Sequence, residues 1–261
     1  MCSIDKIVNL EKHPIDSLNK YAIDCFDKIN NESVLQLDDF LTIEALEKIL
    51  KESENLKNNV YYCSQYHTIL LNKKNTNLDY DDPLNIEVKS DKGCVPHDMI
   101  PEKSYLNLLY HSCRFKNFLK KVLNLKNIYS YKDKLSSINY NYYEKNQQLG
   151  WHFDNASFAI TLMISSPSEG GIFQFINKGR NYEKNYINKK LIKNVLNEKE
   201  KVNELKVKPG TLVLFYGRNY LHRVTPIISQ KGRVLVTLNY NLEKGIELSE
   251  NARQTFFGRL K

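Results

Sequence analysis

The sequence lacks several features that would point to other classes of protein. No stretch approaches the roughly 20 apolar residues of a membrane-spanning helix. The start, MCSIDKIVNLEKH, lacks the apolar centre of a secretory signal. The five cysteines are scattered and form no C-x-x-C pair, which leaves neither a zinc knuckle nor a redox motif. We therefore expect a soluble, cytoplasmic protein with reduced thiols.

A concentrated patch of one charge is also missing. The formal net charge is +8, but the lysines are spread among asparagines along most of the chain. A biased Lys/Asn composition explains this charge more simply than a nucleic-acid-binding surface does. We expect neither nucleic acid nor a membrane as a partner, although the positive field would weakly favour a dianionic ligand.

Apolar side chains, at 41% of the sequence, are plentiful enough for one sizeable core. We interpret residues 1–261 as a single domain. Its expected parts are a helical and mixed region over 1–135, a strand-rich core over 136–242 with a helical insertion at about 181–201, and a C-terminal segment over 243–261.

The N-terminal region mixes helix and strand signals. Ile43, Leu46 and Ile49 recur at helical spacing after Thr42, which is a plausible N-cap. In chain order, the expected elements are a helix near 15–30, a strand at 34–37, the helix after Thr42, a strand over 60–71, a long polar loop over 72–93 and a helix over 104–125.

Short strand-like runs dominate from Ser136 onward. They are SINYNYY, SFAITLMIS, IFQFI, ELKVK, TLVLFY and RVLVTLNYN, separated by Gly, Pro or Asn signals. This density of short strands predicts a mainly β jelly roll or barrel, with the N-terminal helices packed on its outer face.

The segment GWHFD, followed about 70 residues later by LHRVTP, carries the chemistry. Residues two apart on a strand project to one face, so His152 and Asp154 can reach one metal ion together. His222, from a distant strand, completes three ligands and leaves the opposite coordination positions open. This set suits iron(II) that binds oxygen and an organic chelate, while zinc and manganese remain chemically possible.

A lone H-x-D is a weak signal, and its context strengthens it. Arg233 follows in the strand-like run RVLVTLN, where its guanidinium can pair with the far carboxylate of 2-oxoglutarate. The alternative, in which the two histidines are ordinary core residues, does not explain why Asp154 and Arg233 lie at compatible spacings. The other histidines have no matching partners, and we expect them to be surface or core residues.

These residues resemble the iron(II) and 2-oxoglutarate dioxygenases, whose pattern is H-x-D, a distal His and then Arg. The likeness is strongest to the HalD-like subgroup of free-amino-acid hydroxylases and radical halogenases. It rests on LGWHFDNASFAITLMISSPSEGGIFQFI, GTLVLFYGRNYLHRVTPI, FFGR and VLQLDDFLT. A more distant similarity to prolyl hydroxylases lies in Thr161, Gly170-Gly171 and the spacing from Tyr143 to His152.

The resemblance implies a double-stranded β-helix fold, with iron(II), 2-oxoglutarate and oxygen as cofactor and co-substrates. It makes His152, Asp154 and His222 the metal ligands and catalytic residues, and Arg233 the partner of the 2-oxoglutarate carboxylate. Thr161 and Tyr143 match positions that line the co-substrate pocket in similar enzymes, although each also fits an ordinary sheet residue.

The resemblance also bears on the outcome of the reaction. Halogenases of the subgroup have a small residue where this chain has Asp154, so the carboxylate argues for hydroxylation. Relatives carry a His-Pro-Arg type segment where this chain reads DYDDPLNIEVKS, which leaves the substrate open. We expect a small amino acid or a similar metabolite. The alternatives are a protein side chain, nucleic-acid demethylation, or a catalytically silent metal-binding protein.

Overall fold

The computed structural model describes residues 4–16, 19–177 and 179–261. Its α-helices are α1 (Asn19–Glu32), α2 (Ile43–Asn55), α3 (Tyr105–His111), α4 (Cys113–Val122), α5 (Lys189–Leu196) and α6 (Glu250–Phe257). Its strands are β1 (Val34–Leu37), β2 (Tyr61–Thr68), β3 (Glu87–Val95), β4 (Ile138–Tyr143), β5 (Leu149–His152), β6 (Ala159–Ser165), β7 (Phe173–Ile176), β8 (Arg180–Asn181), β9 (Tyr186–Ile187), β10 (Asn203–Leu205), β11 (Leu212–Phe215), β12 (Leu221–Val224) and β13 (Arg233–Leu238).

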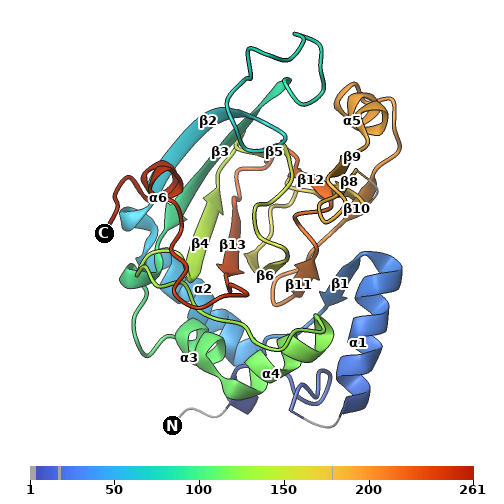
Figure 1. The fold of residues 1–261 in the computed structure, drawn as a ribbon. Coiled ribbons are helices and arrows are strands. Elements are labelled where there is room, and N and C mark those ends of the chain that lie inside the picture. The colour runs from blue at the N-terminus through green and yellow to red at the C-terminus, as the bar shows by residue number, and fades with distance from the viewer. Residues whose placement is uncertain (1–3, 17–18, 178) are drawn as a thin grey trace.

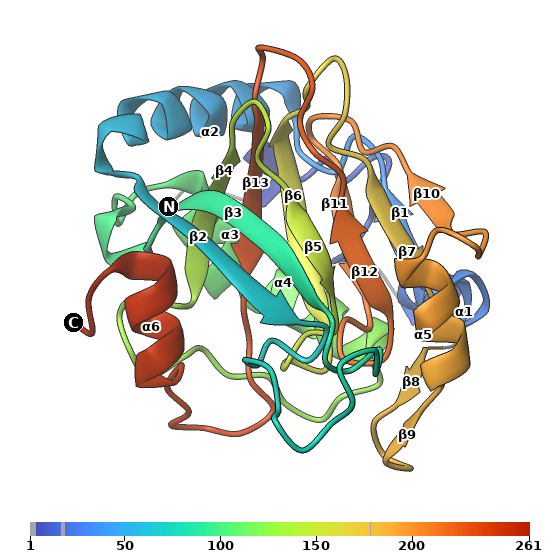
Figure 2. The ribbon, with the colours of Figure 1, turned by 90° about the horizontal axis from the view of Figure 1, so that it is seen from above.

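Two antiparallel sheets lie face to face (Figures 1 and 2). The large sheet has seven strands in the order β1-β11-β6-β13-β4-β3-β2, and the small sheet has four in the order β10-β7-β12-β5. Strands from distant parts of the chain alternate within each sheet, as in a double-stranded β-helix. The predicted mainly β jelly roll is confirmed. Three strands from before residue 136 also extend the large sheet at its two edges.

Helices α1 to α4 cover the outer face of the large sheet (Figure 1). Thr42 caps α2, because its side-chain oxygen accepts a hydrogen bond from the Ala45 N–H at 3.1 Å. The single helix predicted over 104–125 is instead two helices. Ser112 has extended backbone angles (φ −63°, ψ 124°) and its side chain caps α4 at Phe115 N, so the first helix ends there.

The long loop predicted over 72–93 is wrong at its C-terminal end, because Glu87–Val95 forms strand β3. This strand pairs with β2 over Glu87–Cys94 and with β4 over Gly93–Val95. Its sequence, EVKSDKGCV, has no apolar alternation, so hydrogen bonding to two neighbours, rather than hydrophobicity, defines it. The predicted strand over 60–71 is shorter than expected and ends at Thr68.

Two later elements lie beside the sheets. The insertion at about 181–201 contains the β8-β9 hairpin and helix α5, whose Ile192 and Val195 are buried against Trp151 of β5 and its neighbours. Helix α6 lies beside β2 and β3 (Figure 1). No helix in the described part of the chain combines the length and the apolar character that a membrane crossing requires.

Candidate metal and co-substrate site

Successive side chains of β4 point to opposite faces of the large sheet. Asn139, Asn141 and Tyr143 line a cavity between the two sheets. Tyr140 and Tyr142 point the other way, and their hydroxyls each donate a 2.8 Å hydrogen bond to a group of helix α2. This follows from the period of two in a strand, which places successive side chains on opposite faces. The large sheet therefore presents one face to the helices and a different one to the cavity.

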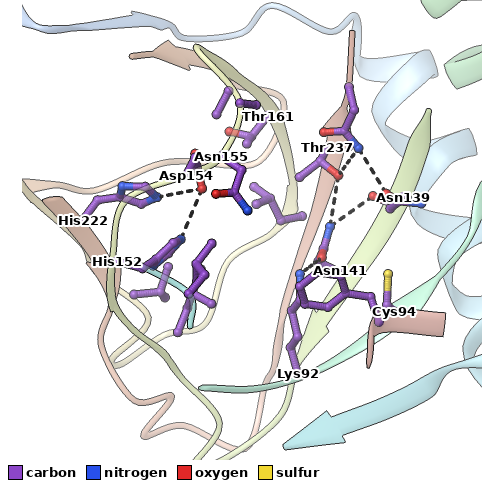
Figure 3. Close-up of a pocket in the computed structure, with 18 of the residues that line it drawn as sticks. Lys92, Cys94, Asn139, Asn141, His152, Asp154, Asn155, Thr161, His222 and Thr237 are labelled. Atoms are coloured by element: carbon purple, nitrogen blue, oxygen red, sulfur yellow. Dashed lines mark hydrogen bonds and ion pairs between the residues drawn. The ribbon is translucent and has the colours of Figure 1, made fainter. Parts of the chain in front are cut away.

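The cavity has a volume of about 300 Å³ and is lined by both sheets, the loop after β5 and helix α6. Figure 3 shows the histidines and Asp154 on one side, and a row of polar residues from β3, β4 and β13 on the other. A volume of this size between two packed sheets suits small ligands.

His152, Asp154 and His222 converge at this cavity. One possible ligand atom from each lies within 4.8 Å of the others. Asp154 Oδ1 is 3.3 Å from His152 Nε2 and 3.6 Å from His222 Nε2. The two histidines are paired across neighbouring strands, since His222 of β12 lies opposite His152 of β5. Three residues from two distant segments thus present their donor atoms to one point.

Backbone carbonyls fix the orientation of both imidazoles. His152 Nδ1 lies 2.8 Å from Gly150 O, and His222 Nδ1 lies 2.8 Å from Tyr220 O. A carbonyl only accepts, so each Nδ1 carries the proton and each Nε2 offers a lone pair to the cavity. Such partners hold metal-binding histidines in the right tautomer and orientation.

The electrostatics keep these groups in the forms that bind a cation. Burial and the nearby His152 lower the pKa of His222 to about 4, so this imidazole is neutral at physiological pH. Burial alone would raise the pKa of Asp154, but His222, His152 and Lys92 outweigh it and hold the pKa below its usual range. The site therefore presents a neutral His222 imidazole and the Asp154 carboxylate, beside the Nε2 atom of His152.

Gly217 makes room for the Asp154 carboxylate. A Cβ atom at Gly217 would overlap Asp154 Oδ2 and crowd the carboxyl carbon. The Gly217 carbonyl also accepts a 2.9 Å hydrogen bond from the Asp154 N–H. The glycine lies just after β11, so its close approach to Asp154 depends on the tertiary fold. Sequence reasoning missed it, and no local signal singles it out.

A hydrogen-bond chain supports the strand that carries His152. The Gly150 N–H donates to Ser90 Oγ at 2.9 Å, and the Ser90 hydroxyl donates to His67 Nε2 at 2.6 Å. His67 Nδ1 in turn donates to the Thr68 carbonyl at 2.9 Å. These groups are buried, so the chain locks the backbone of β5 in place. His67 is thus a structural residue beside the site, as expected for a histidine without a sequence partner.

Arg233 lies at the cavity with unsatisfied donors. Its side chain is 3% exposed, and its Nε and Nη1 have no hydrogen-bond partner in the protein. The guanidinium lies over the ring of Tyr143, its cross-strand neighbour, at 5.3 Å from the centroid. Burial lowers the pKa of Arg233, yet a guanidinium remains charged in proteins. Buried donors of this kind need an anionic partner.

Tyr143 and Thr161 both line the same cavity. Thr161 belongs to β6, and its hydroxyl makes only a long contact of 3.5 Å with the Val213 carbonyl. Both side chains therefore border the same space as Arg233.

The donor set fits the cofactors that the sequence suggested. Two imidazole nitrogens and a carboxylate oxygen on one side, with the cavity open on the other, are the ligands that non-haem iron(II) prefers. The two unpaired N–H groups of Arg233 fit a carboxylate of a chelating co-substrate.

Comparison with solved structures gives the class of fold. A 2OG-Fe(II) oxygenase family protein from Burkholderia pseudomallei aligns with a TM-score of 0.55 and 13% identity, over 87% of this chain and 93% of that one. A prolyl-4-hydroxylase from Pseudomonas putida gives 0.52 and 11%, over 83% and 96%. The carbocyclase SnoK of nogalamycin biosynthesis gives 0.58 and 10%, over 87% and 85%. Comparison with curated proteins gave no match.

Residues 24–256 match the Halogenase D family, and the chain belongs to that family. It is therefore a 2-oxoglutarate-dependent oxygenase, which uses iron(II), 2-oxoglutarate and oxygen. The predicted resemblance and cofactors are confirmed.

Proposed function

We propose that this enzyme hydroxylates an unactivated carbon of a small amino acid or an amino-acid-like metabolite. His152, Asp154 and His222 hold the iron, and Arg233 binds the far carboxylate of 2-oxoglutarate. The observation that carries the proposal is the Asp154 carboxylate, whose Oδ1 lies within 3.6 Å of both imidazole Nε2 atoms.

Asp154 decides between the two reactions of the family. Bound iron(II), 2-oxoglutarate and oxygen supply the power to oxidise a C–H bond, and the protein supplies orientation. In the radical halogenases that the chain resembles, a small residue leaves a coordination position for a halide. Here the Asp154 carboxylate would take that position, and Gly217 and the two histidines contact Asp154 in the structure. This supports hydroxyl transfer over halogen transfer.

Arg233, Tyr143 and Thr161 form the proposed co-substrate end of the cavity. A dianion bound there satisfies the two unpaired N–H groups of Arg233, whose burial would otherwise be unfavourable. The side chains of Tyr143 and Thr161 line the same cavity and would contact the same ligand. This arrangement would hold one end of 2-oxoglutarate, and its keto-acid end would supply the chelating group for the metal.

The cavity volume of about 300 Å³ supports a small substrate, because the co-substrate must share it. Helix α6 and the loop after β5 border the cavity and restrict the room available to a polypeptide.

Succinate formation tests the proposal directly. The protein is incubated with iron(II), 2-oxoglutarate and oxygen, with and without pooled amino acids and their derivatives, and the products are identified by mass spectrometry. We expect succinate release that rises with one class of small substrate, together with a product 16 Da heavier, the mass of one oxygen atom.

Asp154→Ala is the matched variant for this assay. It should abolish hydroxylation, since the remaining two imidazoles hold iron weakly. A chlorinated product from the wild type in the presence of chloride would contradict the assignment of Asp154. So would full activity of the variant. Stimulation by peptides alone would favour the protein side-chain alternative.

A further inference from the structure

A second positively charged side chain lines the cavity, and the proposed binding of iron and 2-oxoglutarate does not use it. Lys92 and Arg233 both line it, and Arg233 is accounted for by the co-substrate. Asp154 is the only carboxylate among the described residues that line the cavity, and it belongs to the metal site. The remaining space is therefore bordered by a positive charge and by no counter-ion of its own.

Lys92 projects from β3 into this space. Its Nζ donates a 2.5 Å hydrogen bond to Asn141 Oδ1 and lies 5.0 Å from the ring centroid of Phe256 on helix α6. In Figure 3 it stands with Asn141 on the wall opposite the two histidines. An ammonium group has three N–H donors, and the hydrogen bond to Asn141 uses one of them.

A comparison within β3 shows what is unusual about Lys92. Lys89, three residues earlier, forms an ion pair of 2.6 Å with Asp91 and does not line the cavity. Among the described residues, Lys92 has no carboxylate within ion-pair distance. Asp91, its chain neighbour, is already engaged with Lys89. A partly buried ammonium without a counter-ion is stabilised when a ligand brings one.

Thr237 adds a second donor on the same wall. Its Oγ1 accepts hydrogen bonds of 3.4 Å from Asn141 Nδ2 and from Asn239 Nδ2. With its acceptor positions used in this way, the hydroxyl proton of Thr237 is left to donate. Asn141 connects the two donors, because its Oδ1 accepts from Lys92 while its Nδ2 donates to Thr237. The wall thus forms one connected set with donors available beside the cavity.

We propose that Lys92 and Thr237 form an anion subsite that binds a carboxylate of the substrate, and that the enzyme selects substrates that carry no unneutralised cationic group. The inference rests on the proposed function and deepens it. A carboxylate fits two convergent donors of which one is charged. A cationic substrate meets the positive side chain of Lys92, which no other ligand neutralises, and finds no acid among the described lining residues except the metal ligand.

The consequence is a defined order of preference. For one carbon skeleton, the N-acetylated acid should bind at least as tightly as the zwitterionic amino acid. The amino-acid amide, which is cationic and lacks the carboxylate, should bind much more weakly. Removing the charge at Lys92 should weaken carboxylate binding by roughly 10- to 100-fold, as expected for one charge-assisted hydrogen bond.

The test measures binding without turnover. Enzyme loaded with iron(II) and 2-oxoglutarate is kept free of oxygen and titrated with the standard amino acids, their N-acetyl forms and their amides, by calorimetry and by the shift of the unfolding midpoint. The variants are Lys92→Met, Lys92→Arg and, as the control on the same strand, Lys89→Met. The affinity for 2-oxoglutarate alone is measured for each variant first.

We expect carboxylate-bearing probes to bind the wild type. Lys92→Met should weaken that binding, while Lys92→Arg restores most of it and Lys89→Met leaves it unchanged. The affinity for 2-oxoglutarate should stay constant in all three variants. Equal binding of acids and amides would overturn the proposal, as would the absence of binding by every acid.

A loss of 2-oxoglutarate affinity in Lys92→Met would also overturn it, by placing Lys92 in the co-substrate end of the cavity. Failure of the proposed function would look different, because the wild type would then not bind 2-oxoglutarate before any probe was added.

Discussion

The two faces of the large sheet differ in almost every physical respect. Its outer face packs against helices α1 to α4 through Val236 and Leu238 of β13, which are buried among apolar side chains. Its inner face places Arg233 and Thr237 of the same strand at the cavity. Side chains of the protein itself cover the outer face. The inner face leaves donors that a ligand must satisfy, and this difference separates the residues that hold the fold from those that bind.

The largest effect on stability is expected from a substitution among the core residues on the outer face. Phe115 of α4 is fully buried and lies 6.0 Å from the ring of Phe40. Phe115→Ala should lower the free energy of unfolding by about 3–5 kcal/mol, because it leaves a cavity in the core. Urea unfolding measures this. Binding of 2-oxoglutarate by the folded protein should stay unchanged, and a weakened site would show that the two faces are coupled.

The inner face should respond in the opposite way to a change next to Asp154. Gly217→Ala forces the carboxylate to move, because the new Cβ would overlap Asp154 Oδ2. We expect metal affinity to fall about 10- to 100-fold, as for other changes to groups that orient ligands. The unfolding midpoint without metal should barely change. Metal titration and thermal unfolding give the two readings, and unchanged metal affinity would show that Asp154 has room to spare.

Replacing Arg233 should change the free energy of unfolding and the affinity for 2-oxoglutarate in opposite directions. Arg233→Met removes a buried charge with two unpaired donors, so the protein without ligands should gain about 1 kcal/mol in unfolding free energy. The same change should strongly reduce the affinity for 2-oxoglutarate while metal binding persists. Calorimetric titration and chemical unfolding check both effects. Normal co-substrate affinity would mean that another group holds the carboxylate.

The smallest effect is expected from Glu52, an acid on the helical side that contacts β4. Glu52 of α2 accepts hydrogen bonds of 2.8 Å from Tyr140 and Ser104, and burial raises its pKa above the ordinary value. The folded state then binds more protons than the unfolded state over the interval between the two pKa values. Stability therefore falls as pH rises through that interval, which begins near pH 4.

Glu52→Gln should remove this slope. Unfolding free energies of the wild type and the variant, measured across acid to neutral pH, should converge at low pH and separate in favour of the variant as pH rises. Parallel curves would mean that Glu52 titrates alike in both states. Enzyme activity should not respond, because Glu52 lies on the outer side of the sheet.

How far the sequence predicts this protein depends on whether a feature is local. The period of two in a strand predicts that His152 and Asp154 share one side; β5 ends at His152 and Asp154 lies in the loop after it, yet the structure brings both residues and His222 together. The metal role of all three stays a proposal. The density of short apolar runs predicted the β-rich fold. Each of these inferences uses neighbours in the chain or a pattern that the family shares.

The features that sequence reasoning missed depend on contacts between distant segments. Strand β3 has a polar sequence and is defined by its pairing with β2 and β4, so Lys92 was assigned to a loop. Gly217 matters only because Asp154 approaches it from another part of the chain. Local composition predicts neither strand β3 nor the role of Gly217, because both depend on how distant segments are arranged in the fold.

The pairing of His222 with His152 also has a kinetic consequence. About 70 residues of chain separate the two strands, and closing so long a loop is entropically unfavourable before its contacts form. The three ligand atoms therefore meet only after β12 has joined β5. During refolding, the uptake of a metal ion should lag behind the formation of the helices. Its rate would report the closure of the small sheet.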